Sequence, residues 1–301
     1  MNGKINYDKL PSGIASNVIT KGCLIIEGGA FRGVYAQGVT DCLMEHNFNF
    51  ECTVGCSAGA LTGMNYVSGQ IGRAIRINLA YRHDSRYVGL KAIMKNNGLI
   101  GFDFVLNGVN QYNRFDTRRF LSNNRRFVAV ATDIKTGKPR YFDKAMAADY
   151  QSTIQASASM PFVSKPVAIE DSFYLDGGIT DSIPYQWAIN HGYEKVIVVR
   201  TREDTYRKNT KKMSNVLNHS ELFKEYPALG KALNDRPTMY NRQCDTLDRL
   251  VKGESVFRIS PSEPVTVGRL ESNISKLEEL YWFGYQDAKK QLNNLDDYLK
   301  K

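Results

Sequence analysis

The stretch Gly55-Cys56-Ser57-Ala58-Gly59 contains the residue that is best placed to act as a nucleophile, Ser57. It follows a β-favouring run and precedes a helix-compatible one, which predicts a sharp strand-to-helix turn that projects the serine hydroxyl. The helix behind it would point free N–H groups at any negative charge that forms nearby. These features suit a serine nucleophile. The pentapeptide alone is weak evidence, because glycine and serine also cluster in ordinary turns. Cys56 beside it is expected to be a small apolar residue pointing into the sheet.

A second stretch, Gly28-Gly29-Ala30-Phe31-Arg32-Gly33, lies between a predicted strand and a predicted helix. A glycine loop in that place aims backbone N–H groups at one point. It could hold a phosphate, or it could stabilise the oxyanion of a tetrahedral intermediate. The loop has neither the Gly-x-Gly-x-x-Gly pattern nor the Gly-Lys-Ser/Thr ending of nucleotide sites, so nucleotide binding is the weaker interpretation. A tight turn without a ligand stays open on this loop alone.

The third stretch is Asp176-Gly177-Gly178. An aspartate before two glycines is often only a turn; the functional interpretation is that Asp176 is the base that activates Ser57. A Ser-His-Asp arrangement in the chain order of α/β-hydrolases would need a histidine after Asp176, which leaves His191 and His219. His191 ends a predicted helix beside a glycine, and His219 lies in a polar region. Neither has a context that marks it as catalytic.

The predicted elements around these stretches alternate between strand and helix. A strand at 22–27, a helix at 34–46, a strand at 51–55 and a helix at 60–66 indicate a parallel sheet with right-handed crossovers. The first two strands should be neighbours, so that the glycine loop and Ser57 meet at the carboxyl edge of the sheet, where such sheets bind ligands. Further strands are predicted at 125–133, 140–142, 195–200 and 254–261, the first two as a hairpin. Further helices are predicted at 72–82, 116–121, 145–157, 184–191, 216–250 and 275–300, and residues 86–113 are a candidate insertion or lid.

Taken together, these motifs resemble those of the patatin-like phospholipases over roughly residues 20–200. The segment 156–162 before the aspartate, and Ala131-Thr132-Asp133 followed by Thr136-Gly137, add to the resemblance. It implies a three-layer α/β/α fold with a mainly parallel central sheet. It also implies a Ser57–Asp176 dyad without histidine and an oxyanion hole made by the N–H groups of Gly28, Gly29 and Ala30. Ala30 stands where the family usually has a third glycine.

The resemblance further assigns supporting roles to residues that shape these turns, with Arg32 orienting the glycine loop through an ion pair or hydrogen bonds. The others are Gly33, Gly55, Gly59, Gly177 and Gly178. The implied function is a serine acyl hydrolase that cleaves phospholipids, lysophospholipids or related lipid esters through an acyl-enzyme. Neither a metal nor a cofactor is expected. The alternatives are a catalytically idle lipid- or membrane-binding protein and a Ser-His-Asp esterase that uses His191 or His219.

Length and composition limit the domain organisation. The 301 residues, 42% hydrophobic and 24% charged, can bury a sizeable core. No linker or repeat divides them, so we expect one domain, with a catalytic core at 20–200 and a mainly helical extension at 201–301 packed on it. Five scattered cysteines, an odd number, indicate reduced thiols in a cytosolic compartment.

The net charge of +9 fits a solvated basic surface, nucleic acid or an anionic membrane surface. With the resemblance, we expect lipid esters as substrates, no nucleic-acid partner, and peripheral contact with an anionic membrane through basic segments at 114–126 and 200–212. No run of 18 apolar residues is present. The expected location is the cytoplasm, at the inner membrane surface, and the oligomeric state is left open.

Overall fold

The computed structural model describes residues 6–89, 91–92, 94, 98, 100–109, 114–122, 124–147, 149–211 and 220–301. In this part of the chain, eight strands form one sheet in the order β10-β9-β2-β3-β5-β8-β7, with β6 paired to β5. The first five strands of this order are parallel: β10 (Phe257–Ile259), β9 (Val196–Val199), β2 (Thr20–Ile26), β3 (Phe50–Cys56) and β5 (Arg126–Asp133). The remaining pairings are antiparallel and involve β6 (Lys138–Asp143), β7 (Val167–Ile169) and β8 (Ser172–Asp176).

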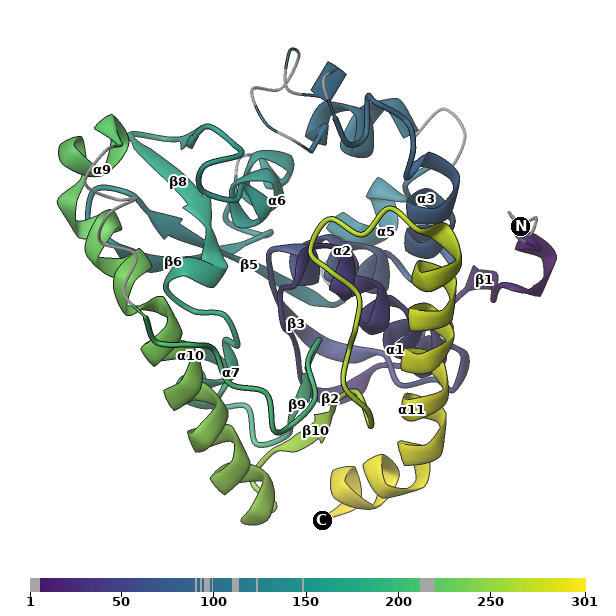
Figure 1. Ribbon diagram of the computed structural model, residues 1–301. Coiled ribbons are helices and arrows are strands. Elements are labelled where there is room, and N and C mark those ends of the chain that lie inside the picture. The colour runs from purple at the N-terminus through teal and green to yellow at the C-terminus, as the bar shows by residue number, and fades with distance from the viewer. Residues whose placement is uncertain are drawn as a thin grey trace.

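Helices cover both faces of this sheet, which confirms the predicted three-layer α/β/α fold (Figure 1). Side chains of β2 alternate between two cores: Leu24 and Ile26 join one cluster, and Cys23 and Ile25 join the other. The first cluster includes side chains of α1 (Val34–Glu45), α2 (Ala58–Ser68), α3 (Arg73–Tyr81), α6 (Tyr150–Ala158) and α11 (Ile274–Lys300). The second includes side chains of α7 (Tyr185–Asn190) and α10 (Pro227–Lys252).

The shorter elements connect these layers. They are α5 (Thr117–Leu121), α9 (Glu221–Glu225), the helical turns η1 (Tyr7–Lys9), η2 (Ala30–Gly33), η3 (Phe104–Gly108) and η5 (Gly177–Ile179), and a two-stranded sheet of β1 (Gly13–Ile14) and β4 (Gln70–Ile71). Four of them, η2, η5, β4 and α9, lie within two residues of a longer element, so they set the direction in which the chain enters or leaves it.

The register of the sheet brings the three predicted motifs together. Ile26 of β2 pairs with Gly55 of β3, so the glycine loop and the serine turn leave the sheet side by side. Cys56 pairs with Val130 of β5, and the next β5 residue, Ala131, pairs with Asp176. Because β8 runs antiparallel to β5, its last residue lies one level beyond the end of β3, where Ser57 begins its turn.

The C-terminal helix α11 packs along α1, with their backbones in close contact at two glycines. A Cβ atom at Gly38 would lie 2.7 Å from the backbone nitrogen of Tyr285, and one at Gly284 would lie 2.8 Å from the carbonyl carbon of Tyr35. The Tyr281 hydroxyl donates to Asp41 Oδ2 at 2.8 Å. The end of the chain is therefore attached to the helix that directly follows the glycine loop.

The structure confirms the predicted hairpin, as β5 and β6, and changes several element boundaries. The helix predicted at 145–157 begins only at Tyr150, because the Asp149 side chain caps it by accepting from the N–H of Gln151. Part of the predicted lid at 86–113 and the start of the helix predicted at 216–250 fall outside the described residues.

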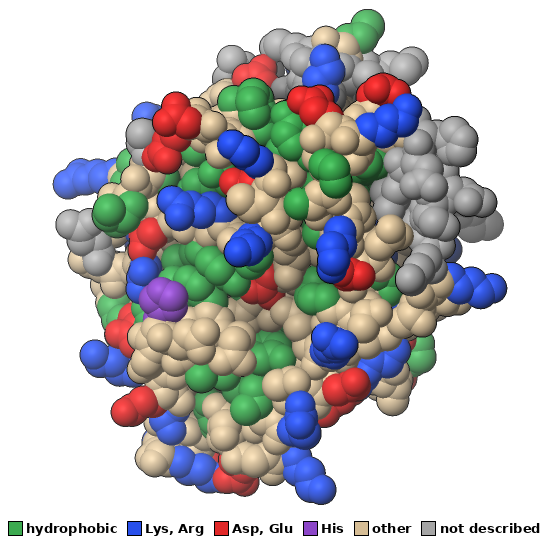
Figure 2. All heavy atoms as spheres, turned by 90° about the vertical axis from the view of Figure 1, so that its left-hand side faces the viewer, with side chains coloured by type: hydrophobic (Ala, Val, Ile, Leu, Met, Phe, Trp, Pro, Cys, Tyr) green, Lys and Arg blue, Asp and Glu red, His purple; other side chains and the backbone are tan. Residues whose placement is uncertain are grey.

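The surface bears on the predicted membrane contact. Figure 2 shows Lys and Arg side chains spread over the face that carries α9 and α10, interspersed with acidic and hydrophobic ones. Two arginines of the predicted basic segments point inward instead: Arg125 donates to the Phe50 carbonyl at 3.0 Å, and fully buried Arg200 pairs with Glu27 at 3.6 Å. None of the helices in the described ranges is both long and apolar enough to cross a bilayer.

Candidate active site

Ser57 occupies the turn between β3 and α2 in a conformation that few non-glycine residues adopt. Its φ is 58° and its ψ is −125°, a backbone strain of about 1–3 kcal/mol that the surrounding structure must sustain. The turn is packed too closely for larger residues at its flanks. A Cβ at Gly55 would lie 2.6 Å from Ala60 Cα, and one at Gly59 would lie 2.8 Å from the carbonyl carbon of Ile26. The backbone N–H of Ser57 donates to Ser157 Oγ at 2.9 Å, which holds the turn.

Asp176 lies within hydrogen-bond distance of Ser57. Ser57 Oγ donates to Asp176 Oδ2 at 2.6 Å, and the other carboxylate oxygen accepts from the N–H of Gly178 at 2.7 Å. Burial raises the pKa of Asp176 above its ordinary value, although the Ser57 hydroxyl and the charge of Arg236 act in the opposite direction. The carboxylate is thus fixed in position and more basic than an exposed one.

The glycine loop lies against the serine turn. A Cβ at Gly28 would be 2.9 Å from Ser57 Cβ, and one at Gly33 would be 2.8 Å from Ala58 Cβ. Within the described ranges, the backbone N–H groups of Gly28, Gly29 and Ala30 have no hydrogen-bond acceptor. Unpaired N–H groups beside a nucleophile are what an oxyanion hole requires.

Ala30 adopts a left-handed conformation with φ of 51°. This conformation costs an L-residue about 1–2 kcal/mol relative to glycine, which explains why the resemblance leads one to expect glycine at this position. Alanine thus adopts the left-handed conformation here that glycine adopts without this cost.

The two glycines after Asp176 are confined by their neighbours. A Cβ at Gly177 would lie 2.6 Å from the carbonyl carbon of Val130, and one at Gly178 would lie 3.0 Å from Asp176 Oδ1. Arg32 has no carboxylate partner in an ion pair in the described ranges, and its buried Nε has no hydrogen-bond partner there. Burial and the charges of Arg202 and Arg269 lower the pKa of Arg32 to about 10.

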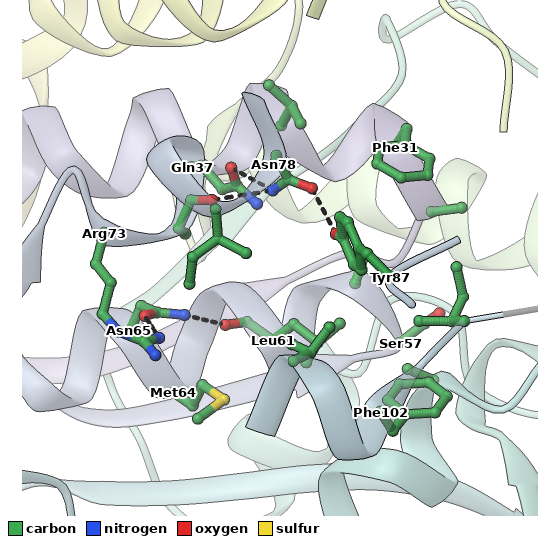
Figure 3. A pocket seen from close by; sticks show the side chains of 18 of the residues that line it. Phe31, Gln37, Ser57, Leu61, Met64, Asn65, Arg73, Asn78, Tyr87 and Phe102 are labelled. Carbon is green, nitrogen blue, oxygen red and sulfur yellow. Dashed lines mark hydrogen bonds between the residues drawn. The ribbon is translucent and has the colours of Figure 1, made fainter. Parts of the chain in front are cut away.

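Ser57 opens onto a narrow apolar pocket of about 80 Å³ between α1, α2, α3 and the segment 100–105. Figure 3 shows Phe31, Leu61, Met64 and Phe102 along its walls, with Ser57 at one end. Polar side chains behind the walls form hydrogen bonds with one another; for example, the Tyr87 hydroxyl donates to Asn78 Oδ1 at 2.7 Å. The pocket can therefore take an apolar chain without exposing unpaired polar groups to it.

A second, wider cleft of about 540 Å³ meets the apolar pocket at Ser57 and Ala30. Asp176 and the glycine loop line it on one side. The rest of the lining combines apolar side chains, such as Phe162, Leu233 and Leu270, with five basic ones: Arg32, Arg202, Lys208, Arg236 and Arg269. The sequence motifs do not predict Arg236 and Arg269 as site residues. These arginines belong to no motif and approach the site only because the C-terminal part of the chain packs there. The only available signal was the basic character of the chain, which does not say where the charges gather.

Of the two histidines considered for a Ser-His-Asp site, the structure describes His191, whose contacts are with Trp187. His191 Nδ1 lies 2.7 Å from the Trp187 carbonyl oxygen, and its ring stacks on that indole with centroids 3.9 Å apart. His219 lies outside the described residues. Cys56 is fully buried in the second core, and burial raises the pKa of its thiol well above the ordinary value, consistent with the apolar role expected for it. In the described ranges, no group of three or more His, Cys, Asp or Glu side chains could hold a metal ion.

Comparisons with known proteins identify the family of the chain. A family model described as patatin-like phospholipase matches residues 24–189, and one described as a domain of unknown function (DUF6363) matches residues 226–300. The chain is 27% identical over 269 residues to the uncharacterized protein YjjU of Escherichia coli (strain K12), covering 87% of this chain and 74% of that protein. It is 24% identical over 274 residues to a probable lipid hydrolase of Invertebrate iridescent virus 6, covering 79% of this chain and 91% of that protein.

Among solved structures, the crystal structure of VipD from Legionella pneumophila is similar to the chain, with a TM-score of 0.47 and 12% sequence identity. The similarity covers 95% of this chain and 68% of that one.

Proposed function

Because this chain belongs to the patatin-like phospholipase family, we propose that it is a serine acyl hydrolase that cleaves phospholipids, lysophospholipids or related lipid esters. The observation that carries the proposal is the 2.6 Å hydrogen bond from Ser57 Oγ to Asp176 Oδ2, placed where a narrow apolar pocket meets a wider cleft that carries five basic side chains. The viral relative described as a probable lipid hydrolase supports the lipid class of substrate.

In the first half of the reaction, Ser57 Oγ attacks the ester carbonyl carbon while its proton passes to Asp176. The carbonyl oxygen becomes negative and accepts hydrogen bonds from the N–H groups of Gly28, Gly29 and Ala30. One such donor is typically worth about 3 kcal/mol of barrier. The tetrahedral intermediate then collapses: the bond to the alcohol breaks, and the departing oxygen takes the proton from Asp176, which leaves an acyl-enzyme on Ser57.

In the second half, water attacks the acyl carbonyl and gives its proton to Asp176. Collapse of this intermediate releases the fatty acid, and the proton returns to Ser57 Oγ. A carboxylate is ordinarily a weaker base than imidazole, and the burial that raises the pKa of Asp176 reduces this difference. The acyl chain occupies the apolar pocket throughout, which fixes the carbonyl against the glycine loop.

The test is covalent labelling of the whole chain with a fluorophosphonate, followed by mass spectrometry of the labelled peptide. We expect the adduct on Ser57, no adduct in Ser57→Ala, and loss of ester hydrolysis in both Ser57→Ala and Asp176→Asn. Ser68→Ala is the matched control, because Ser68 lies at the far end of α2, where its hydroxyl is within hydrogen-bond distance of the Asn65 carbonyl at 2.9 Å and of Gln70 Oε1 at 3.1 Å. It should keep wild-type labelling and activity.

Two results would redirect the assignment. Vesicle binding by wild type without labelling or hydrolysis of any ester would indicate the catalytically idle lipid-binding protein. Full activity in Asp176→Asn, combined with loss in His191→Ala or His219→Ala, would indicate a Ser-His-Asp site.

The proposal includes peripheral contact with an anionic membrane surface. Arg114, Arg118 and Lys211 of the predicted basic segments are exposed. Co-sedimentation with phosphatidylglycerol vesicles should exceed that with phosphatidylcholine vesicles and should weaken as salt is added, because surface charges are screened. Equal binding to both vesicle types would contradict the contact.

A further inference from the structure

We propose that the C-terminal part of the chain builds an anion subsite beside Ser57, which selects lipid esters whose head group is a phosphate without a compensating cation. The inference rests on the proposed function, because the subsite shares its cleft with Ser57 and Asp176. Four of its five basic side chains, those of Arg202, Lys208, Arg236 and Arg269, lie outside residues 24–189 that match the family model.

The first observation is an excess of unpaired positive charge. None of the five basic side chains of the cleft forms an ion pair with a carboxylate in the described ranges; the contacts they make there are to neutral groups. Arg236 Nε donates to the Gly178 carbonyl at 2.5 Å, and Arg202 donates to the Val265 carbonyl at 2.7 Å. The Lys208 ammonium lies over the Tyr240 ring, 3.5 Å from its centroid.

The acidic residues of the cleft do not balance this charge. Two carboxylates line it, Glu27 and Asp176. Glu27 is already paired with buried Arg200 at 3.6 Å, and it accepts hydrogen bonds from Tyr240 at 2.7 Å and from the N–H of Thr201 at 2.8 Å. Five cations therefore face two carboxylates in this cleft: Glu27, which is already paired, and Asp176, on which the charges of Arg236 and Arg269 act without forming an ion pair among the described residues.

The basic side chains also act on one another. The charges of Arg236 and Arg202 lower the pKa of Arg269, and Arg236 lowers that of Lys208, in both cases after the larger effect of burial. Such mutual repulsion works against folding, and a bound anion would relieve it. A surface with scattered lysines and arginines would show no such convergence on one cavity.

The packing of α10 explains how this part of the chain reaches the site. Leu233, Arg236, Pro237 and Tyr240 all line the cleft, and their spacing of three and four residues places them on one face of the helix. The hydrogen bond from Tyr240 to Glu27 attaches this face to the end of β2. Arg236, one turn earlier, is thereby held beside the glycines that follow Asp176.

The chemistry of the cleft favours one kind of head group. Guanidinium groups bind phosphate oxygens through paired, charge-assisted hydrogen bonds. A phosphate monoester carries up to two negative charges and brings no cation. A phosphocholine head group brings a quaternary ammonium into a positively charged cleft, which is unfavourable. The expected ligand is therefore an acylglycerol phosphate rather than a choline lipid or a neutral glyceride.

The experiment compares three substrates with the same acyl chain: 1-acylglycerol 3-phosphate, 1-acylglycerophosphocholine and 1-monoacylglycerol. Fatty-acid release by the full chain gives kcat/KM for each. We expect the phosphate monoester to exceed the other two by about tenfold or more, the discrimination typical of a hydrogen bond to a charged group. Inorganic phosphate should inhibit hydrolysis of the phosphate substrate more strongly than that of monoacylglycerol.

The variants test which residues are responsible. In Arg269→Gln and Arg202→Gln, the ratio of kcat/KM for the phosphate substrate to that for monoacylglycerol should fall about tenfold, and Arg269→Lys should restore most of it. Lys231→Gln is the matched control on α10, since Lys231 is exposed and pairs with Asp235 at 2.5 Å; its ratio should equal that of wild type. Calorimetric binding of glycerol 3-phosphate to Ser57→Ala, lost when Arg202 and Arg269 are also replaced, gives a readout without turnover.

The outcomes separate the two proposals. Equal kcat/KM for all three substrates, with Ser57 still labelled by the fluorophosphonate, would overturn the subsite and leave the hydrolase proposal intact. If inorganic phosphate binds but kcat/KM for the phosphate lipid does not exceed that for the other two substrates, the subsite binds a free anion and not a lipid head group. That result would overturn the proposal that the subsite selects the substrate. Absence of labelling and of hydrolysis would overturn the proposed function, whatever the anion binding.

Discussion

Replacing Gly38 by alanine should destabilise the protein, although the same change inside a helix ordinarily stabilises it by up to about 1 kcal/mol. The reason is the close crossing of α1 and α11. The new Cβ would lie 2.7 Å from the backbone nitrogen of Tyr285, whereas non-bonded heavy atoms pack best at about 3.5–4.0 Å. Because the atoms in the way are backbone, no side-chain rotation can relieve the overlap.

The magnitude follows from two opposing contributions. Overpacking a well-filled contact costs typically about 1–3 kcal/mol, and a clash with a rigid helix backbone places this site at the upper end. The gain in helix propensity offsets up to about 1 kcal/mol. A net loss of about 2 kcal/mol is expected. Gly284→Ala should behave in the same way, because its Cβ would lie 2.8 Å from the carbonyl carbon of Tyr35.

Urea unfolding followed by circular dichroism measures the effect, with the midpoint and the slope compared between variants. Gly230→Ala in α10 is the matched control: its Cβ would meet Phe223 Cβ at 3.5 Å, an ordinary contact, so this variant should be as stable as wild type or more so. If Gly38→Ala gained stability to the same degree as Gly230→Ala, the argument that the α1–α11 crossing requires glycine would be wrong.

Three further predictions follow from the site and the core. In Arg236→Gln, the acidic limb of the profile of kcat/KM against pH, for a neutral ester, should move to higher pH. The reason is that the charge of Arg236 lowers the pKa of Asp176, against the burial that raises it. If the limb stays at the same pH, Asp176 is not the group whose titration produces it. Burial raises the pKa of Asp41 from 3.8 to about 7, so the native state holds a proton that the unfolded chain loses, and stability falls as pH rises between these values. Asp41→Asn should remove that fall, up to about 4 kcal/mol, in urea unfolding across pH; parallel wild-type and variant curves would contradict it. Ala74→Phe, in the apolar pocket, should lower kcat/KM for long acyl chains relative to butyryl esters, by about tenfold if two methylenes are excluded; an unchanged ratio would place the chain elsewhere.

The local parts of the site could be predicted from the sequence, because their determinants are local. Gly55 precedes Ser57 for a steric reason that acts within the turn, where a Cβ would meet Ala60. The alternation of strands and helices is enough to place the glycine loop beside that turn, and it is the end of the neighbouring strand, at Ile26, that leaves no room for a Cβ at Gly59. The hydrogen bond between Ser57 and Asp176 depends on more than one strand register. The Asp-Gly-Gly motif alone left an ordinary turn and a histidine triad open as alternatives, since no periodicity relates two residues so far apart in the chain.

The parts that the sequence could not predict are those that packing decides. Arg200 and Arg125 read as members of basic surface segments, but the folded chain buries both against carboxylate or carbonyl oxygens. Arg236 and Arg269 reach the cleft because α10 and the segment before α11 pack over the carboxyl edge of the sheet. A sequence shows where charged residues occur along the chain but not the direction in which each side chain points. The orientation of these four arginines could therefore be seen only in the structure.

The pairing of α1 with α11 has a consequence for the order in which the protein forms. The helix directly after the glycine loop finds its partner only in the last residues of the described chain, with backbone contacts between positions 38 and 281. A chain emerging from the ribosome therefore carries the complete nucleophile turn long before the face of α1 can be covered. Contacts of such high sequence separation slow folding, and the uncovered apolar surface leaves the nascent chain prone to aggregate until α11 has been made.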